Sequence, residues 1–436
     1  MNLLKNLFSI QEKRYHIIIY LLWIKFSFRK IGCKTELPEN LEVQILKDEK
    51  RYKKIIQRIK KNKKCRVCFY VFEISKWKTD SLYKLFDKDD FFEPFIVIGA
   101  TPGRTKFYSI NEKIDRAKIR INYFKSKGMK VYQGYDVKKD KQLSLKKFKP
   151  DIIFYQQHVA NCRLNSIENT KKYALGCYVP YYVPNYGNLK YDYDSFCSQL
   201  FRYYTLNDNL KEYYKSLNSN INNIVVSGHT ALDVFYLNKN SNKEKKYVIY
   251  APHFSIMHPA VKNKFYYSTF NFYSMVILEF AKKHPELNWV FKPHPNLKES
   301  LRKMRVPQEN VDDYYEEWHN LGFICENADY SELFLNSKAM ITDCGSFLTE
   351  YFCTGNPLIH LIHPISINWP CRAMKPMFES FYKVYNKEEL LNTLEQVIVK
   401  QDDYKEKNRL ETMLKMGFAD KYAAENIIND LKKVIS

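Results

Sequence analysis

The chain has 436 residues, of which 45% are hydrophobic and 16% aromatic, which excludes a disordered or collagen-like protein and allows several substantial cores. Its net charge of +22 indicates an anionic partner, such as lipid head groups, a phosphate-rich substrate or nucleic acid. The ten cysteines have neither disulfide-framework nor zinc-site spacing, so we expect free thiols in a reducing compartment.

The N-terminal segment is the most basic part of the chain, because residues 1–64 hold 17 Lys or Arg and 6 Asp or Glu. The apolar run 17–24 is shorter than the about 20 residues that cross a bilayer. Its basic flanks predict a helix lying among lipid head groups, with a core helix as the alternative. Residues 47–64 are also basic and helical by periodicity. We therefore expect residues 1–64 to form a basic amphipathic helical arm that binds an anionic membrane surface.

After residue 64, short apolar runs alternate with longer helical stretches such as 114–127 and 265–284. This alternation predicts parallel sheets with crossover helices, and the break near residue 235 predicts two Rossmann-like domains facing a central cleft. The predicted domains are 65–235 and 236–400, with helices of 401–436 packing across them. The predicted strands are 67–72, 95–99, 130–132, 151–156, 174–179, 223–227, 247–251, 288–292, 322–325, 339–342 and 357–361.

Ligands of open parallel sheets bind beyond the carboxyl ends of the strands, so site residues are expected directly after each strand. Asp343, Gly345 and Ser346 form a small polar turn between a strand and a helix. The first N–H groups of that helix and the Ser346 hydroxyl suit a phosphate, and Glu350 lies one turn later on the same face. The same residue types also suit an ordinary helix N-cap.

Three further loops follow strands of the second half. Lys292 and His294 lie in a Lys-Pro-His-Pro sequence, where two prolines stiffen the backbone and the cationic groups suit a pyrophosphate. The other two loops contain Pro252 and His253, and Gly228-His229 followed by Asp233; each alone is typical of a turn. Together with the turn at 343–346, these loops favour a single anion-binding site.

Other common site types have no sequence signal here. The chain has no Walker A, G-x-G-x-x-G or G-x-S-x-G pattern, which disfavours an ATPase, a simple dehydrogenase and an α/β-hydrolase. No D-x-D sequence stands where a metal-dependent glycosyltransferase needs one. We therefore expect no metal and no cofactor.

The ordered loops resemble the CDP-glycerol glycerophosphotransferase family of teichoic-acid and capsule polymerases. That family carries, in order, Gly-x-Pro-(Arg/Lys)-x-Asp, Tyr-Ala-Pro, Lys-Pro-His-Pro and Ile-Thr-Asp-Tyr-Ser-Ser. The matches here are Gly228 with Asp233, residues 250–252, residues 292–295, and residues 341–343 with Ser346. The resemblance covers residues 223 to about 365. It implies a GT-B-like fold, a CDP-activated donor held by the C-terminal domain, and transfer of a polyol phosphate with release of CMP.

The resemblance also implies roles for individual residues. His294 and Ser346 hold the donor phosphates, Asp343 shapes the loop, and Glu350 lies near the ribose. The full set expected to bind the donor is Gly228, His229, Pro252, His253, Lys292, His294, Asp343, Gly345, Ser346 and Glu350.

Two departures from the family concern the chemistry. Residues 229–231 are His-Thr-Ala where the family has Pro-Arg, and one serine of the family pair is Gly345. Residues 175–181 lack the family's Trp-His-Gly loop, so His158 is the expected general base and His294 the second catalytic residue. Residues Glu73, Lys76 and Trp77 after the first strand are expected to bind the acceptor, with an ordinary polar loop as the alternative.

Other functions stay open. One alternative is a GT-B glycosyltransferase or epimerase that uses a nucleotide sugar, and another is a non-enzymatic polyanion- or membrane-binding scaffold. Nucleic acid is not an expected partner, because no finger, RRM or KH signature is present. We expect the partners to be a CDP-linked donor and a polymeric or lipid-linked acceptor, at the cytoplasmic face of the cell membrane.

Overall fold

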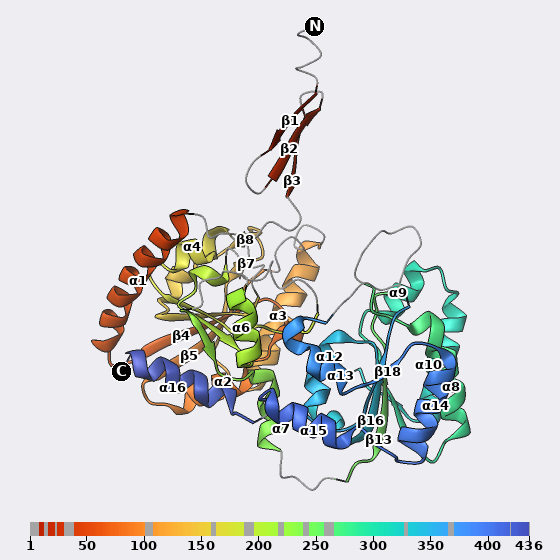
Figure 1. The fold of residues 1–436 in the computed structure, drawn as a ribbon. Helices are drawn as coiled ribbons and strands as arrows, with labels where there is room; N and C mark the ends of the chain where they lie inside the picture. The colour runs from red at the N-terminus through yellow and green to blue at the C-terminus, as the bar shows by residue number, and fades with distance from the viewer. Residues whose placement is uncertain are drawn as a thin grey trace.

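The computed structural model of the chain describes residues 8–12, 16–21, 24–29, 39–100, 108–157, 163–186, 196–216, 222–238, 244–256, 266–326, 330–364, 370–418 and 420–435. Two parallel sheets form its two halves (Figure 1). All eight cysteines within these residues are free and buried, in line with the expected thiols.

The N-terminal segment contains strands where a helix was predicted. β1 (Phe8–Glu12), β2 (His16–Leu21) and β3 (Ile24–Arg29) form a separate antiparallel sheet (Figure 1), so the helix predicted over 17–24 is wrong. Three successive isoleucines and a tyrosine favour strand because β-branched and aromatic side chains fit a pleated surface. The helix predicted from residue 47 is confirmed as part of α1 (Glu39–Lys60). No helix in the described part of the chain has the length and apolarity needed to span a bilayer.

The first large sheet has seven parallel strands, and all six strands predicted for it lie within a few residues of their predicted bounds. β11 was not predicted, because its Arg-Tyr-Tyr-Thr sequence has no clear apolar run. In spatial order the strands are β12 (Ile224–Val226), β11 (Arg202–Thr205), β10 (Leu175–Tyr178), β9 (Ile152–Tyr155), β4 (Cys65–Val71), β5 (Phe92–Ile98) and β6 (Val131–Gln133).

The second sheet has six parallel strands in the same relative order, and the short edge strand β18 was not predicted. Both orders place the first strand beside the fourth, which is the doubly wound arrangement with a switch point between these two strands. The strands are β15 (Phe323–Ile324), β14 (Asn288–Phe291), β13 (Tyr247–Ala251), β16 (Ser337–Thr342), β17 (Leu358–Leu361) and β18 (Tyr382–Val384).

Helices cover the first sheet, and short turns and one small hairpin fill the connections. α1, α2 and α16 pack together on one face (Figure 1). The elements of this half are η2 (Ile74–Lys76), α2 (Asp80–Lys88), α3 (Ile110–Ser126), β7 (Tyr135–Asp136), β8 (Lys141–Gln142), η4 (Leu145–Phe148), η5 (Arg163–Asn165), α4 (Ile167–Thr170), η6 (Cys197–Gln199), α6 (Asp208–Ser216), η7 (Thr230–Leu232) and α7 (Asp233–Leu237).

Helices also cover the second sheet, with α8, α10 and α14 on its outer side (Figure 1). The elements are α8 (Phe270–Lys283), α9 (Leu297–Lys303), α10 (Gln308–Leu321), α11 (Ser331–Leu335), α12 (Gly345–Phe352), η8 (Arg372–Met374), α13 (Lys375–Glu379), α14 (Lys387–Thr393), the π-helix η9 (Leu394–Val399), α15 (Glu406–Lys415) and α16 (Ala423–Ile435).

The two halves share buried surface. One hydrophobic cluster runs from the inner face of the first sheet, through Tyr178 and Tyr203, to Phe347 and Tyr351 of α12 beside the second sheet. The final helix α16 returns to the first half, where Leu431 is fully buried. The loops after the strands of the two sheets are therefore held in contact with each other by packing.

Candidate functional site

Helix α12 begins directly after β16, one of the two strands at the switch point of the second sheet. The Thr342 hydroxyl accepts the N–H of Cys344 at 2.9 Å, and the helix starts at Gly345. The side chain of the N-cap residue Cys344 does not cap the helix, and Ser346 is exposed in the first turn. The N-terminal N–H groups and the helix dipole therefore make this end suitable for an anion.

Asp343 holds the loops after β13 and β16 together. Its buried carboxylate accepts the N–H of His253 at 2.6 Å and the hydroxyl of Thr269 at 2.8 Å, as well as the N–H of Thr269. Burial raises the pKa of Asp343 to about 6, against the opposing effect of these hydrogen bonds. Because its oxygens are used within the protein, Asp343 positions the site.

Two imidazole rings, whose centroids are 5.2 Å apart, lie beside this loop. His253 Nδ1 is 2.7 Å from the Ser255 hydroxyl, and His294 Nδ1 accepts the N–H of Asn296 at 3.1 Å. Burial lowers the pKa of His253 to about 3 and that of His294 to about 4. Both rings are therefore neutral at pH 7. Since each Nδ1 is an acceptor, each Nε2 carries the proton and can donate it to a ligand oxygen.

The cation of the Lys-Pro-His-Pro loop is buried behind the imidazoles. The Lys292 ammonium lies 4.6 Å from the centroid of the Tyr330 ring and 5.6 Å from that of the Phe347 ring. Burial lowers the pKa of Lys292, but the aromatic faces favour its cationic form. Lys292 thus contributes buried positive charge at the end of β14.

Glu350 connects the two halves of the molecule. Its carboxylate pairs with Lys78 of the first half at 2.9 Å and accepts the Tyr330 hydroxyl at 2.6 Å. The Lys78 ammonium also lies 3.2 Å from the Tyr330 hydroxyl. The backbone carbonyl of Lys78 accepts the Thr230 hydroxyl at 2.6 Å. The residue expected near the ribose is therefore engaged in an ion pair across the cleft.

The residues of the loop 228–233 have structural roles that their sequence did not reveal. Gly228 has φ of +84°, which favours glycine. The ring of His229 is buried, with Nε2 2.7 Å from the Pro180 carbonyl and Nδ1 accepting the N–H of Ala231 at 3.2 Å. Asp233 accepts the N–H groups that open α16 and the Ser81 hydroxyl. In this structure both ring nitrogens of His229 have partners within the protein.

The departure at Gly345 has a steric explanation. A Cβ at Gly345 would lie 2.9 Å from Cε2 of Tyr186, a residue of the first half. The Tyr186 hydroxyl lies 3.0 Å from His360 Nε2, and Asn185 donates to the Gly345 carbonyl. Asn185 and Tyr186, which follow β10, therefore pack on the start of α12, and a side chain at position 345 would require the Tyr186 ring to shift.

The predicted acceptor loop follows β4. The side-chain Oε1 of Gln156 accepts the N–H of Glu73 at 3.0 Å, and the Lys76 ammonium donates to the Gln157 side chain at 2.6 Å. The Trp77 ring is buried against Phe69 and Phe124, and its N–H donates to Asp80. Trp77 thus supports the loop from the core, whereas Glu73 and Lys76 are partly exposed. His158 lies outside the described residues.

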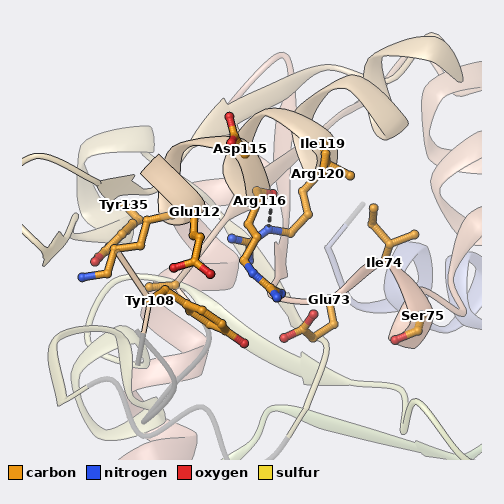
Figure 2. Close-up of a pocket in the computed structure, with 12 residues that line it drawn as sticks. Glu73, Ile74, Ser75, Tyr108, Glu112, Asp115, Arg116, Ile119, Arg120 and Tyr135 are labelled. Atoms are coloured by element: carbon orange, nitrogen blue, oxygen red, sulfur yellow. Dashed lines mark hydrogen bonds between the residues drawn. The ribbon is translucent and has the colours of Figure 1, made fainter. Parts of the chain in front are cut away.

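Two cavities adjoin this loop. One, of about 590 Å³, lies beneath α3 and is lined by Glu73, Arg116 and Arg120 (Figure 2). The other, of about 400 Å³, lies between the halves and reaches Glu350 and Tyr330. Among the described residues, no cluster of three or more His, Cys, Asp or Glu side chains could hold a metal ion.

Sequence reasoning missed four residues of this site: Lys78, Asn185, Tyr186 and Tyr330. Each lies against a residue of the predicted donor set, and all but Tyr330 come from the first half. The available signals were only their positions: Lys78 follows the predicted acceptor loop, and Tyr186 follows the predicted strand 174–179. Neither position indicates which loop of the other half the side chain meets.

Comparison with sequence families supports the resemblance. The profile of the family described as CDP-Glycerol:Poly(glycerophosphate) glycerophosphotransferase matches residues 215–433, just over half of the chain. No curated protein matches the chain in sequence.

Comparison with solved structures confirms the GT-B-like architecture. UDP-GlcNAc 2-epimerase from Neisseria meningitidis bound to UDP-GlcNAc gives a TM-score of 0.54 at 16% identity, covering 85% of this chain and 100% of that one. S. aureus MnaA with UDP gives 0.53 at 14%, covering 84% and 96%. A variant of the wall teichoic acid polymerase TagF gives 0.52 at 14%, covering 91% and 96%. At these identities the similarity concerns the fold alone.

Proposed function

Because the chain belongs to the CDP-glycerol:poly(glycerophosphate) glycerophosphotransferase family, we propose that it transfers glycerol phosphate, or a related polyol phosphate, from a CDP-activated donor. The acceptor is a hydroxyl of a cell-surface polymer or of its lipid-linked precursor, and CMP is released. The observation that carries this proposal is the convergence of His253, His294 and the start of α12 at the switch point of the second sheet.

The transfer is a displacement at phosphorus. An acceptor oxygen attacks the β-phosphorus of the donor, its bond to the oxygen of CMP breaks, and the acceptor proton passes to a base. Such reactions depend on alignment and on stabilising the phosphoryl oxygens more than on covalent catalysis. The Nε2–H groups of His253 and His294 and the N-terminal N–H groups of α12 are the donors proposed for those oxygens.

The role proposed for His294 differs from the cationic one suggested by the sequence. At pH 7 the imidazole is a neutral donor, so Lys292 and the helix dipole supply the positive field. A bound phosphate would favour the protonated ring and raise its pKa. His158 remains the proposed general base, and Glu73 and Lys76 the proposed acceptor contacts.

No metal or cofactor is part of the proposed mechanism. The donor carries its own leaving group, CMP, and the charge on its phosphates is offset by Lys292 and by neutral hydrogen-bond donors. Glu350 is proposed to bind the ribose once a donor separates it from Lys78.

We also propose that residues 1–64 bind an anionic membrane at the cytoplasmic face. In support of this, α1 buries Tyr52, Ile55 and Ile59 against the first half and exposes many of its lysines. A basic helix surface is attracted to anionic lipids by about 1 kcal/mol per cation close to the surface. Cosedimentation with phosphatidylglycerol vesicles, lost in high salt and weakened when the exposed Lys50, Lys53 and Lys54 of α1 are replaced by Gln, tests this location.

The experiment that tests the function is nucleotide release. The protein is incubated with CDP-glycerol, CDP-ribitol, CDP-sugars and UDP-sugars, with membrane extract as acceptor. We expect CMP from one CDP-polyol. Release of UDP would instead assign the chain to the nucleotide-sugar enzymes, and no release from any donor would favour a scaffold.

A further inference from the structure

The cavity beneath α3 is larger than the one between the halves, and the transfer chemistry does not use most of it. It lies beyond the carboxyl ends of β4 and β5, because its lining includes Glu73 and Ala100, which follow these strands. We propose that this cavity binds the acceptor through a phosphate and a neighbouring hydroxyl of its polyol phosphate chain. The inference rests on the proposed function, and it adds an anion subsite on α3 that no sequence motif marks.

Two arginines supply the cationic wall. Arg116 and Arg120 are four residues apart on α3, so they lie on the same face. Arg120 donates to the carbonyls of Phe72 at 2.7 Å and Gly99 at 3.2 Å, and the Arg116 guanidinium stacks 4.1 Å from the Tyr108 ring centroid. These contacts hold two planar donor groups in place before a ligand arrives, and a guanidinium matches a phosphate in geometry.

Charged side chains of both signs line the cavity, and some of them have partners within the protein. The Glu112 carboxylate accepts a backbone N–H at the start of α3, and Lys113 pairs with Asp140 at 3.0 Å. Glu73, Glu112 and Asp115 line the cavity together with Lys113, Arg116 and Arg120, and the Glu73 carboxylate lies beside the arginines (Figure 2). The cavity therefore presents guanidinium donors and carboxylate acceptors side by side. A carboxylate beside an anion subsite suits a ligand that also carries hydroxyl groups.

Tyr135 supplies an independent indication of a ligand. Its side chain lines the cavity and the residue is only 7% exposed. Its hydroxyl has no hydrogen-bond partner among the residues that the structure describes. A buried hydroxyl without a partner is costly, so a ligand hydroxyl or phosphate oxygen there would satisfy a group that the protein leaves open.

The cavity also adjoins the space between the halves, where the transfer is proposed to occur. Ile74 and Ser75 line both this cavity and the one between the halves, which reaches Glu350 and Tyr330. The short helix η2 that contains them is the shared wall. An acceptor chain held at Arg116 can thus extend past Ser75, so that its terminal hydroxyl approaches the donor loops.

The test measures binding of a short synthetic glycerol phosphate oligomer by calorimetry, without any donor. Tyr135→Phe and Arg116→Gln should each weaken binding by about fivefold or more. Lys118→Gln is the matched control, because Lys118 is exposed on the same helix, lies outside the cavity lining and carries the same charge. Tyr135→Phe should not lower the free energy of unfolding, since it removes a buried hydroxyl without a partner.

Three results would overturn the inference: no binding by the wild type at millimolar oligomer, equal binding by all variants, or an equal loss in Lys118→Gln. Failure of the proposed function would be recognised separately. Binding that depends on Tyr135 and Arg116, with no CMP release from any CDP-polyol, would reject the transfer and retain the subsite. CMP release from a CDP-polyol, with oligomer binding unchanged in these variants, would reject the subsite and retain the transfer.

Discussion

The two halves of this chain share a strand order, but their sites are built differently. In the second half, the loops after β13 and β16 meet through one carboxylate, Asp343, and each site residue lies within a few positions of a strand end. In the first half, the cavity beneath α3 takes groups from the loop after β4, from one helix face and from Tyr135. A site made of neighbouring strand ends leaves contiguous sequence motifs, whereas one made of a helix face leaves isolated residues.

The largest effect is expected in the second half, at His294. His294→Ala removes the Nε2–H donor proposed for the phosphoryl oxygens, so turnover should fall about 100-fold. CMP release at saturating donor measures it. His319→Ala is the control, because His319 is exposed on α10. A His294→Ala enzyme with the wild-type rate would remove the imidazole from the mechanism.

The buried ring of His229 predicts how stability depends on pH. Burial lowers its pKa to about 4 in the folded protein, below the ordinary 6.5. Its contribution is therefore present above pH 6.5 and is lost as pH falls towards 4, because the unfolded chain takes up the proton first. The loss is up to about 3 kcal/mol. Urea unfolding should show a smaller decrease between pH 7 and about pH 4 in His229→Gln than in wild type. Equal decreases would show that His229 is not buried as a neutral ring.

The contact between the halves at Gly345 can be tested by a double-mutant cycle. Gly345→Ser restores the family residue but places its Cβ against Tyr186, so it should cost about 1–3 kcal/mol of stability. Tyr186→Ala removes the obstruction. The double variant should therefore lose less free energy of unfolding than the two single variants lose together. Unfolding free energies measure the coupling. Strictly additive losses would mean that contact with Tyr186 is not the reason for glycine at position 345.

The smallest expected effect concerns the ion pair between Lys78 and Glu350. If a donor ribose must replace Lys78, Lys78→Gln should lower the KM for the CDP-linked donor, by about fivefold at most because ion pairs of this kind contribute under about 1 kcal/mol. Glu350→Gln should raise the same KM by removing the proposed ribose acceptor. Steady-state kinetics with varied donor measure both values. A change in the same direction for both variants would contradict the competition.

The candidate site shows where sequence reasoning ends. Lys292, His294 and Asp343 were found because strand-end loops of a doubly wound sheet converge whatever their partners are. Arg116 and Tyr135 were not found, because a charged helix and a lone tyrosine are common and only packing brings them to one cavity. Trp77 was expected at the acceptor, but an aromatic residue one turn from a buried strand packs in the core as readily as it faces a ligand.

The sequence by itself determined the strands of the two large sheets except β11 and β18, and the site loops that follow them, since apolar periodicity and strand-end chemistry are local properties. It misassigned residues 17–24, where β-branched side chains favour strand pairing over the expected helix. Only the tertiary structure decided which groups face one another: Lys78 with Glu350, Tyr186 over Gly345, and Asp233 at the start of α16. Those contacts join residues far apart in the chain, and the packing of the two halves against each other is what brings them together.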